Sequence, residues 1–570
     1  NTIREIETME RTKCYLKMYS GIAIVTGLLT FATNAPAADF EPISHVSADA
    51  NIRLTVLGRY WGGWFSRSTP PAPAYDRKSQ RLFVGSDDRH TLEILDISDP
   101  SEPALFKAVD LSLWGSEPNR LAQSHGIVAV VVTDDTKPDS SVLFFNADGD
   151  MVAEPVAIEG GREIAFSPNG KKLIVTIESV LEDPYSELDS GIAVLDLKST
   201  NWGVCRNKPS KCHLDVNVEI ASFNIFNDQR DELVERGVRL PFASLPYTGI
   251  TVSRDLQPAA VTIGDNSRTA WISLVANNAI VEVDLNTAEI TNIYGLGSKD
   301  NSVAGNGIDA SDKDGMINIR TWPLQSFYAP DGIRVVGGGS NAYLVTANEG
   351  DPRDPEVERG RNLVLDPVQF PDAATLQEDS NLGRLKISIV DGDTDGDGDL
   401  DELFTFGSRS FSTWSTSGQL LFDSGDDFEQ ITAQVLPDFF NAAEDENEFD
   451  KRSDDRGPEP EGLAVGKLYG QHYAFVTFER IGGVIVYDIT DPQAPRFQQY
   501  INNRNFGVEP KDVCGSKGNL GLPTCPLAGD LEPEGILFIP REESPIDAPL
   551  LAVTYELSDS TSLFRIDRTD

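Results

Sequence analysis

The chain has 570 residues, with 90 acidic against 48 basic side chains and a formal net charge of −42. This length suffices for one large repeat domain or for two to four ordinary domains. The charge excludes nucleic acid as a partner, because nothing would neutralise its phosphates. It favours a soluble protein of saline or calcium-rich surroundings, in which most of the acids are plain solvated surface groups.

The N-terminal segment indicates export. Arg11, Lys13 and Lys17 precede an apolar run over residues 22–31, and a small-residue cleavage site follows at Ala35–Ala37. We expect residues 1–37 to be a signal peptide with some upstream sequence, and residues 38–570 to be a single domain. Neither this run nor any later one is long enough for a membrane span. The expected location is therefore periplasmic, cell-surface or extracellular.

Cysteine usage agrees with export. Cys14 belongs to the signal segment, and the remaining four cysteines form the close pairs Cys205/Cys212 and Cys514/Cys525. We predict two local disulfides, since secreted proteins keep such bonds. Metal binding by these cysteines is less favoured, because their spacing is not C-x-x-C and the chain has only five histidines.

Short β-type runs follow one another along the chain, bounded by Gly, Asn, Asp or Pro, and helical periodicity is scarce. Two strand-and-turn phrases, Leu92–Pro103 and Val484–Pro495, are near duplicates. The clearest predicted strands are residues 82–84, 92–95, 127–132, 142–145, 172–177, 192–195, 270–274, 280–283, 342–346, 473–477, 484–487 and 550–554.

Phrases that recur at blade-like intervals predict an all-β fold, a β-propeller of about seven blades, although six or eight blades also fit. The strand over residues 52–57 is expected to close the ring against the last unit. A β-sandwich array is the structural alternative. The predicted units are residues 52–115, 116–160, 161–220, 245–300, 328–425, 458–505 and 530–570. The predicted insertions are residues 221–245 and 300–328, and the acidic, Pro-rich loops 350–384 and 426–457.

One acidic loop fits the calcium pattern D-x-D-x-D-G-x5-E. Its candidate ligands are Asp391, Asp393, Asp395, Asp397, Asp399 and Glu402. A register shifted by two residues places Leu400 at the usual apolar position but loses the terminal Glu. The sequences of the flanking residues 385–390 and 403–406 predict strands, so we expect a structural calcium loop within a hairpin. The alternative is an acidic turn without metal.

Further carboxylates recur in matching phrases. Glu461 and Glu534 lie in Pro-Glu-Gly, Asp331 lies in Pro-Asp-Gly, and Glu163 belongs to a looser copy, Gly161–Phe166. Three more acids, Glu349, Glu479 and Glu556, end the apolar runs that follow these phrases. In a propeller such acids meet at the mouth of the central channel, where their repulsion calls for bound cations. The alternative is that each Glu caps a turn.

Two arginines next to these acids, Arg334 and Arg480, are the candidate catalytic residues, because a cation beside metal-bound carboxylates suits a phosphoryl group. Arg409 and Arg456 are second candidates for that role. The alternative for any of these arginines is a salt bridge to a neighbouring acid.

Phrases in the C-terminal half resemble those of the secreted choice-of-anchor I proteins. They are residues 406–412, 422–429, 452–462, 478–484 and 530–535. The resemblance runs from about Ala48 to the end, and it implies an extracellular β-propeller. Some cyanobacterial members are described as atypical, calcium-requiring alkaline phosphatases. Tyr555 departs from the family, which has an amide at that place.

These observations favour a secreted, metal-dependent phosphomonoesterase with a carboxylate-lined metal site at the propeller channel. Its expected cofactors are Ca²⁺ and a second metal such as Fe³⁺, and its expected partner is a small phosphorylated substrate. The alternative is a non-catalytic, calcium-stabilised surface or matrix propeller that binds partners, contacts extracellular matrix or self-associates. The absence of a recognisable nucleophile phrase favours this alternative.

Overall fold

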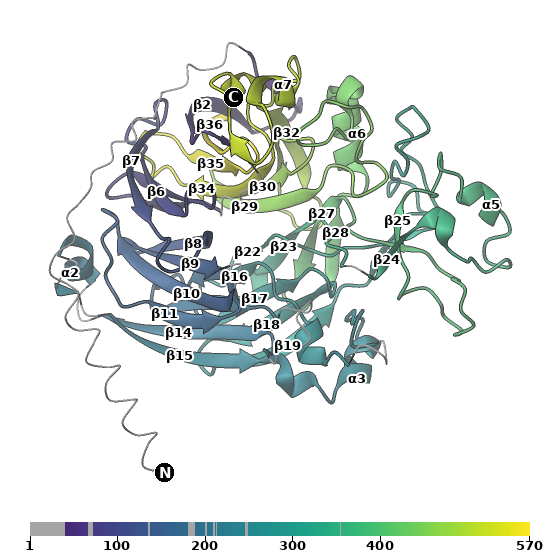
Figure 1. The fold of residues 1–570 in the computed structure, drawn as a ribbon, viewed down its shortest axis with the longest axis horizontal. Helices are drawn as coiled ribbons and strands as arrows, with labels where there is room; N and C mark the ends of the chain where they lie inside the picture. Colours follow the sequence, from purple (N-terminus) through teal and green to yellow (C-terminus); the bar gives the residue numbers. More distant parts are fainter. Residues whose placement is uncertain are drawn as a thin grey trace. The chain divides into compact units, whose positions relative to one another are not determined.

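The computed structural model describes residues 40–66, 72–134, 137–179, 188–199, 202–208, 211–212, 214–244, 249–353 and 355–569. The predicted signal segment, residues 1–37, lies outside these described residues. Residues Asn34–Asp570 cluster into one compact unit. Within it, antiparallel sheets follow one another around a common centre (Figure 1).

Seven sheets of the described chain have four or five antiparallel strands. The first three sheets are β4 (Ala74–Asp76), β5 (Arg81–Ser86), β6 (Thr91–Asp96) and β7 (Ala104–Asp110); β8 (Glu117–Ser124), β9 (Ile127–Asp134), β10 (Lys137–Asn146) and β11 (Val156–Glu159); and β12 (Gly161–Phe166), β13 (Lys172–Ile177), β14 (Gly191–Ser199) and β15 (Leu214–Ser222). The fourth and fifth are β16 (Val261–Ile263), β17 (Thr269–Leu274), β18 (Ala279–Asp284) and β19 (Glu289–Gly295); and β22 (Ile333–Val336), β23 (Tyr343–Asn348), β27 (Ser410–Ser415) and β28 (Leu420–Asp423).

The last two sheets each recruit a strand from the N-terminal part of the chain. The sixth has β29 (Pro460–Leu468), β30 (Gln471–Phe478), β31 (Val484–Asp488) and β32 (Arg496–Asn502), with β1 (Ile43–Val46) added at its edge. The seventh has β34 (Pro533–Ile539), β35 (Leu550–Tyr555) and β36 (Ser560–Arg568), with β2 (Ile52–Trp61) paired to β36. The predicted closing strand over residues 52–57 is therefore confirmed.

The sheets form a closed β-propeller, and apolar packing explains the closure. Each consecutive pair of sheets encloses its own cluster of buried apolar side chains, including the pair formed by the last and the first sheet. The second and third strands are buried on both faces, as in β23 and β35, where every residue is buried. Strands that are buried on both faces usually have continuous apolar sequences. All twelve strands predicted from such sequences are observed. The sandwich alternative is excluded by this ring.

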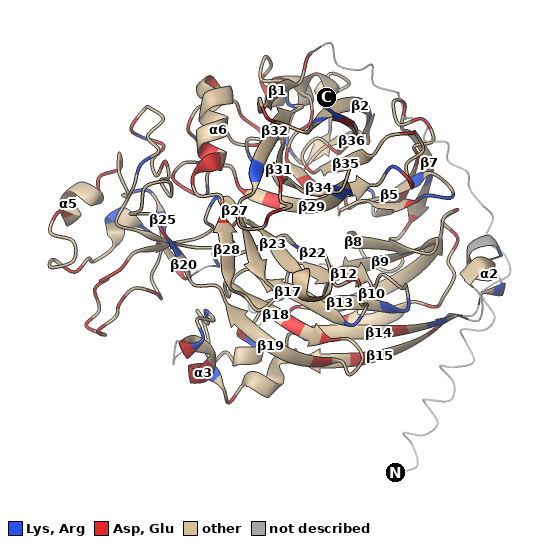
Figure 2. Ribbon diagram, turned by 180° about the vertical axis from the view of Figure 1, so that it is seen from behind, with Lys and Arg blue, Asp and Glu red and all other residues tan. Residues whose placement is uncertain are grey.

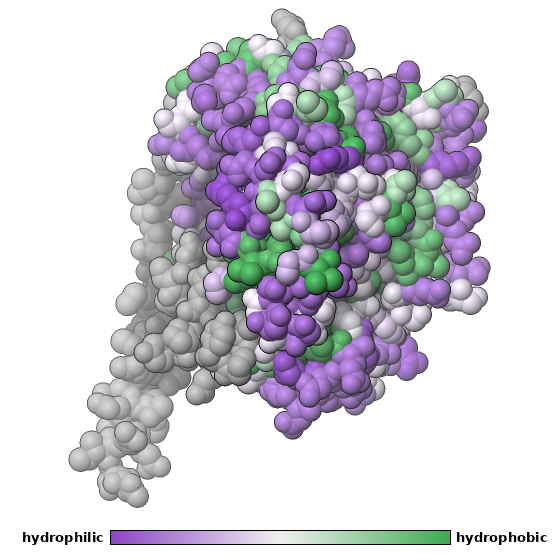
Figure 3. All heavy atoms as spheres, turned by 90° about the vertical axis from the view of Figure 1, so that its right-hand side faces the viewer, coloured by the Kyte–Doolittle hydropathy of each residue, from purple (hydrophilic) through white to green (hydrophobic). Residues whose placement is uncertain are grey.

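The insertions carry short elements of their own. Residues 221–245 contain η2 (Phe223–Phe226) and α3 (Arg230–Glu235), and residues 300–328 contain β21 (Gln325–Phe327), which pairs with β20 (Ser298–Asp300). The two segments expected to be loops include helices, α5 (Ala373–Leu376) and α6 (Asp427–Val435). Both segments remain insertions between the sheets, and each contains one short α-helix that the sequence did not predict. Hydrophilic atoms cover much of the face in Figure 3, with separate apolar patches.

Remaining short elements connect or flank the sheets. They are β3 (Trp64–Phe65), α2 (Trp202–Asn207), α4 (Val252–Asp255), η3 (Gly339–Asn341), β24 (Val357–Arg359), η4 (Gly360–Asn362), β25 (Lys386–Ser388), β26 (Phe404–Thr405), η5 (Pro437–Phe439), α7 (Pro510–Cys514), β33 (Asn519–Leu520) and η6 (Cys525–Ala528).

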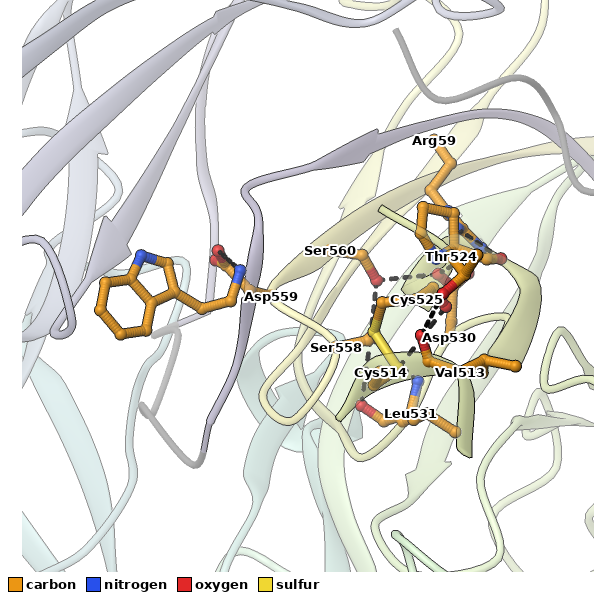
Figure 4. The surroundings of a disulfide bond; sticks show 12 residues. Arg59, Val513, Cys514, Thr524, Cys525, Asp530, Leu531, Ser558, Asp559 and Ser560 are labelled. Carbon is orange, nitrogen blue, oxygen red and sulfur yellow. Dashed lines mark hydrogen bonds and ion pairs between the residues drawn. A yellow bond between two sulfur atoms is a disulfide. The ribbon is translucent and has the colours of Figure 1, made fainter. Parts of the chain in front are cut away.

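Both predicted disulfides are present, Cys205–Cys212 and Cys514–Cys525. The second joins the end of α7 to the start of η6, next to the seventh sheet (Figure 4). In the same region Asp530 is buried and accepts a hydrogen bond from the hydroxyl of Ser560 at 2.8 Å. The disulfide loop therefore adjoins the segment that leads into β34 and its Pro-Glu-Gly phrase.

Candidate functional site

One cavity of about 460 Å³ lies where the first strands of all seven sheets meet. Its lining includes residues of β4, β8, β12, β16, β22, β29 and β34, so it is the central channel. Glu163, Asp331, Glu461 and Glu534 all line it. The acids of the repeated phrases thus share one cavity, as the sequence predicts.

Strand register explains why the acids share one end of the channel. Pro460 pairs with Phe478, and Pro533 pairs with Tyr555. The start of the first strand and the end of the second therefore lie side by side in each sheet, and the acids that follow at 461 and 479, or 534 and 556, share that end. We call this end the mouth.

The phrase before each first strand has a recurrent backbone conformation. Ala329, Glu459 and Glu532 each precede a proline and have positive φ values of 44°, 53° and 61°. Their carbonyl oxygens accept hydrogen bonds from the backbone N–H groups of Gly350, Glu479 and Glu556, at 3.1, 2.9 and 2.7 Å. Non-glycine residues seldom adopt this conformation, so the repeat positions the following acid by a specific turn.

The glycine of the phrase is explained by close packing of neighbouring first strands. A Cβ on Gly332 would lie 2.7 Å from the backbone carbonyl oxygen of Glu461, and one on Gly462 would clash with the carbonyl oxygen of Glu534. The Gly462 N–H also donates to the hydroxyl of Thr477 at 2.8 Å. The glycine of the phrase therefore allows the neighbouring first strand to approach closely.

The looser copy is offset by one residue. The Glu163 N–H donates to the hydroxyl of Thr176 at 2.9 Å, just as Gly462 does to Thr477. Arg162 therefore occupies the place of Glu461, and Glu163 that of Gly462. Arg162 pairs with Glu178 at 3.2 Å, so the third sheet brings a cation to the position where the sixth brings an acid.

The carboxylates gather in overlapping groups. Three groups at the mouth each have oxygens within 4.8 Å of one another: Asp331, Glu349 and Glu461; Glu349, Glu459 and Glu479; and Glu479, Glu532 and Glu556. In Figure 2, acidic and basic segments lie close together around β27 and β29. Only oxygen donors are present in these groups, and such sets suit hard cations.

Glu461 is the least compensated of these acids. Its Oε2 is buried without a hydrogen-bond partner, and no basic side chain of the described residues pairs with it. Burial, followed by the charges of Glu534 and Glu479, raises the pKa of Glu461 well above its usual range. No backbone N–H of the described chain caps its carboxylate, so the turn-cap alternative does not account for it.

Neighbouring acids are perturbed in the same direction. Burial, with repulsion from Glu534 and Glu163, raises the pKa of Asp331 to about 7. Burial and the charge of Glu459 raise the pKa of Glu479 to about 8. The mouth therefore holds more negative charge than it can keep ionised alone, and a proton or a cation must compensate it.

The two candidate catalytic arginines differ in their surroundings. Arg480 forms ion pairs with four carboxylates, those of Glu479 (2.7 Å), Glu532 (2.7 Å), Glu459 (2.9 Å) and Glu444 (3.5 Å). Arg334 lines the channel, where its Nη1 donates to the carbonyl oxygen of Ile333 at 2.7 Å. No carboxylate of the described chain pairs with Arg334, and burial lowers its pKa. Arg334 is therefore the arginine open to a ligand.

Sequence reasoning missed several residues of the mouth. Glu459 and Glu532 precede the predicted acids by two positions. Arg456, a second candidate from the sequence, is instead paired with Glu349 at 2.5 Å and with Glu459 at 2.8 Å. Arg120 from β8 pairs with Glu163 and lies 3.8 Å from Glu534. The shared wording Glu-Pro-Glu-Gly was a usable signal for the two glutamates, whereas no local pattern marks Arg120.

The predicted calcium loop is arranged differently from a hairpin. β25 pairs with β24, and β26 pairs with β21, so the two flanking strands do not pair with each other. The hairpin expectation was wrong because each strand finds a partner in another insertion.

Two acidic groups form in this loop, and Asp401 belongs to both. They are Asp393, Asp395 and Asp401, and Asp366, Asp399 and Asp401. Asp391 instead pairs with Arg239 at 2.7 Å, and Glu402 is exposed. Asp397 accepts a hydrogen bond from the backbone N–H of Asp399 at 3.1 Å. The arrangement favours the shifted register over the one that ends at Glu402.

The chain belongs to the choice-of-anchor I domain family, which matches residues 72–492. A mesenchyme-specific cell surface glycoprotein of Strongylocentrotus purpuratus is 32% identical over 290 residues, covering 43% of this chain and 37% of that protein. Gigasin-3a of Magallana gigas is 31% identical over 206 residues, covering 34% of this chain and 68% of that protein. The match thus spans well under half of the Strongylocentrotus purpuratus protein.

Two solved structures resemble the chain at low identity. The β-propeller domain of Cps50 (Swd1) from Myceliophteria thermophila has a TM-score of 0.40 and 10% identity, covering 90% of this chain and 99% of that domain. Hydrazine synthase of Kuenenia stuttgartiensis has a TM-score of 0.26 and 11% identity, covering 49% and 80%.

Family membership and the two disulfides indicate a secreted or cell-surface β-propeller protein. Among the described residues, no helix combines the length and apolar character that crossing a membrane requires.

Proposed function

We propose that the channel mouth binds divalent cations, Ca²⁺ foremost, and that the protein hydrolyses phosphate monoesters there. The observation that carries this proposal is Glu461, whose buried Oε2 lacks a partner while oxygens of Asp331 and Glu349 lie within 4.8 Å. These residues fit a hard cation, because the donors are all carboxylate oxygens. Fe³⁺ is the proposed second metal at the mouth.

The chain's own residues would bind and orient the substrate. Arg334 would bind the phosphoryl oxygens, since it lines the same channel and has no carboxylate partner. Phe166, Ile263 and Phe538 also line the cavity and would exclude water from part of the substrate. The bound metals would supply Lewis acidity and a hydroxide nucleophile. A cavity of about 460 Å³ is large enough for a small phosphate ester.

The proposal is tested by phosphate release from an aryl phosphate at alkaline pH, with Ca²⁺ and iron supplied. Wild-type protein should release phosphate, and Arg334→Gln should lower kcat/KM by about 100-fold, as removal of one transition-state donor does. Arg541→Gln is the matched control, because Arg541 is exposed and pairs with Asp547 at 2.7 Å. If wild-type protein released no phosphate under these conditions, the proposed phosphatase activity would be excluded.

A second candidate is a non-catalytic, calcium-stabilised surface propeller that binds partners or self-associates. Two observations favour it. Arg480 is neutralised by four carboxylates, and one relative is named as a cell surface glycoprotein. Light scattering with and without Ca²⁺ tests this candidate. Ca²⁺-dependent association by protein that releases no phosphate supports it, whereas a monomer that turns over substrate contradicts it.

A further inference from the structure

A second buried acidic cluster lies outside the channel, where two insertions meet. Asp309 belongs to the insertion at residues 300–328, Glu429 belongs to α6, and Asn441 and Asp450 follow η5. All four side chains are buried, with at most 2% of each residue exposed. Figure 2 shows the acidic segments of α6. We call these four residues the inter-insertion cluster.

Hydrogen bonds join the members of the inter-insertion cluster. The amide nitrogen of Asn441 donates to Glu429 Oε1 at 3.0 Å and to the hydroxyl of Ser453 at 2.8 Å. That hydroxyl donates to Asp450 Oδ1 at 2.5 Å. The backbone N–H of Asp309 donates to Glu429 Oε2 at 2.9 Å. These hydrogen bonds therefore connect the cluster into one buried network.

Two oxygens of this network have no partner. Asp450 Oδ2 and Asn441 Oδ1 are both buried without a hydrogen bond. They belong to side chains that share Ser453 as a neighbour. A buried oxygen without a partner loses its hydration and gains nothing in return. Each of these two oxygens therefore calls for a bound group that is positive or donates a hydrogen bond.

Charge identifies that group. The cluster contains three carboxylates. One guanidinium contacts it, that of Arg409, which donates to Glu429 Oε1 at 2.6 Å and to the carbonyl oxygen of Asp309 at 2.7 Å. Burial and the charge of Glu429 raise the pKa of Asp309 to about 7. Burial, with repulsion from Asp309, Asp314 and Glu429, raises the pKa of Asp450 to about 8. Full ionisation would leave two uncompensated negative charges, the charge that one divalent cation neutralises.

We propose that the inter-insertion cluster binds one divalent cation, Ca²⁺ by its donor chemistry, with Asp450 Oδ2 and Asn441 Oδ1 among the ligands. Carboxylate and amide oxygens are the donors that Ca²⁺ takes in proteins. Both named ligands belong to the segment after η5, and Asn441 also hydrogen-bonds to Glu429 of α6. This site does not depend on phosphatase activity, since none of the four residues lines the channel.

The cluster also supports the mouth from outside. The Nη2 of Arg409 donates to the carbonyl oxygens of Ser453 and Asp455, at 2.9 and 3.0 Å. Arg456 follows directly and pairs with Glu349 at the mouth. The segment that presents Arg456 to the channel is therefore held by Arg409 and, through the hydrogen bond from Ser453 to Asp450, is linked to the proposed ligand.

The first experiment counts calcium. Metal-free full-length protein is titrated with CaCl₂ in an isothermal titration calorimeter, and Asp450→Asn is compared with wild type. We expect the variant to bind one ion fewer per chain. Asp445→Asn is the matched control, because Asp445 lies in the same segment but pairs with Lys517 at 2.8 Å, and it should keep the wild-type count. Equal counts in wild type and Asp450→Asn would overturn the proposal and indicate a protonated Asp450.

A second measurement avoids dependence on a variant. In crystals of wild-type protein grown with Ca²⁺, anomalous density should lie about 2.3–2.6 Å from both Asp450 Oδ2 and Asn441 Oδ1, the usual calcium–oxygen distance. A water at hydrogen-bond distance, or no density, would overturn the proposal. Density at the mouth is read separately, so failure of this site and failure of the proposed function remain distinguishable.

Discussion

Replacement of Glu461 by Gln tests how the mouth carries its charge. Oxygens of Asp331 and Glu349 lie within 4.8 Å of an oxygen of Glu461. Two unit charges at that distance repel by about 3.5 kcal/mol at an effective dielectric constant of about 20. The ionised form of Glu461 is therefore disfavoured, in agreement with its raised pKa. Gln mimics the protonated form, so we expect the variant to fold at neutral pH.

The sign of the pH dependence follows from the raised pKa. Folded Glu461 keeps its proton at pH values where the unfolded chain, with a pKa of 4.5, has lost it. The folded state then binds more protons, so its stability is greatest below pH 4.5 and falls as the pH rises. One such group contributes a slope of about −1.4 kcal/mol per pH unit. Asp331 and Glu479 add to this slope up to about pH 7 and about pH 8.

The assay is urea unfolding in the presence of a chelator between pH 5.5 and pH 7. The free energy of unfolding of wild type should fall with pH, and Glu461→Gln should make this fall shallower, by at most about 1.4 kcal/mol per pH unit. Glu159→Gln, at an exposed position of β11, should leave the slope unchanged. Identical slopes for wild type and Glu461→Gln would refute the inference that Glu461 holds a proton when no metal is bound.

Three further predictions concern the fold and the acidic loop. Gly462→Ala should destabilise the protein by about 1–3 kcal/mol, since the added Cβ would clash with the carbonyl oxygen of Glu534. Urea unfolding should show no such loss for Gly338→Ala, where the atom nearest to the added Cβ is 3.6 Å away. Removing the Cys514–Cys525 bond by a double Ala substitution should lower stability by about 3 kcal/mol, the loop-closure contribution for a separation of 11 residues; an unchanged unfolding midpoint would contradict this. Asp401→Asn should abolish calcium binding at the acidic loop, because Asp401 belongs to both acidic groups. Glu402→Gln should retain calcium binding in the same calcium titration. If Glu402→Gln abolished binding and Asp401→Asn retained it, the register that ends at Glu402 would be correct.

Local sequence was sufficient for the buried strands that are continuous apolar runs. The third strands β27 and β36 are also largely buried, but they were not predicted because their sequences, SFSTWS and STSLFRIDR, are rich in Ser and Thr. The predicted closing strand over residues 52–57 is part of β2, which pairs with β36. α6 was missed, although Phe428, Ile431 and Val435 follow helical spacing. The many acidic residues of this segment favoured the prediction of a loop.

Only those residues of the site that lie in repeated sequence phrases could be predicted. The acids of the Pro-acid-Gly phrases reach one cavity because strand register is the same in each sheet. The partners of those acids are not repeated. Arg120 comes from β8 and meets Glu534 from β34 only when the ring closes. The positive φ of Glu459 and Glu532 likewise arises from a turn that the neighbouring strand stabilises, not from residue preference.

The most direct test of the central claim is the calcium content of purified protein after gel filtration in buffer free of chelator. Elemental analysis compares wild type with the Glu349→Gln/Glu461→Gln double variant. If cations make this gathering of carboxylates tolerable, the double variant should retain at least one calcium fewer per chain. An identical metal content, with the channel still folded, would show that protons and arginines compensate the mouth without any metal.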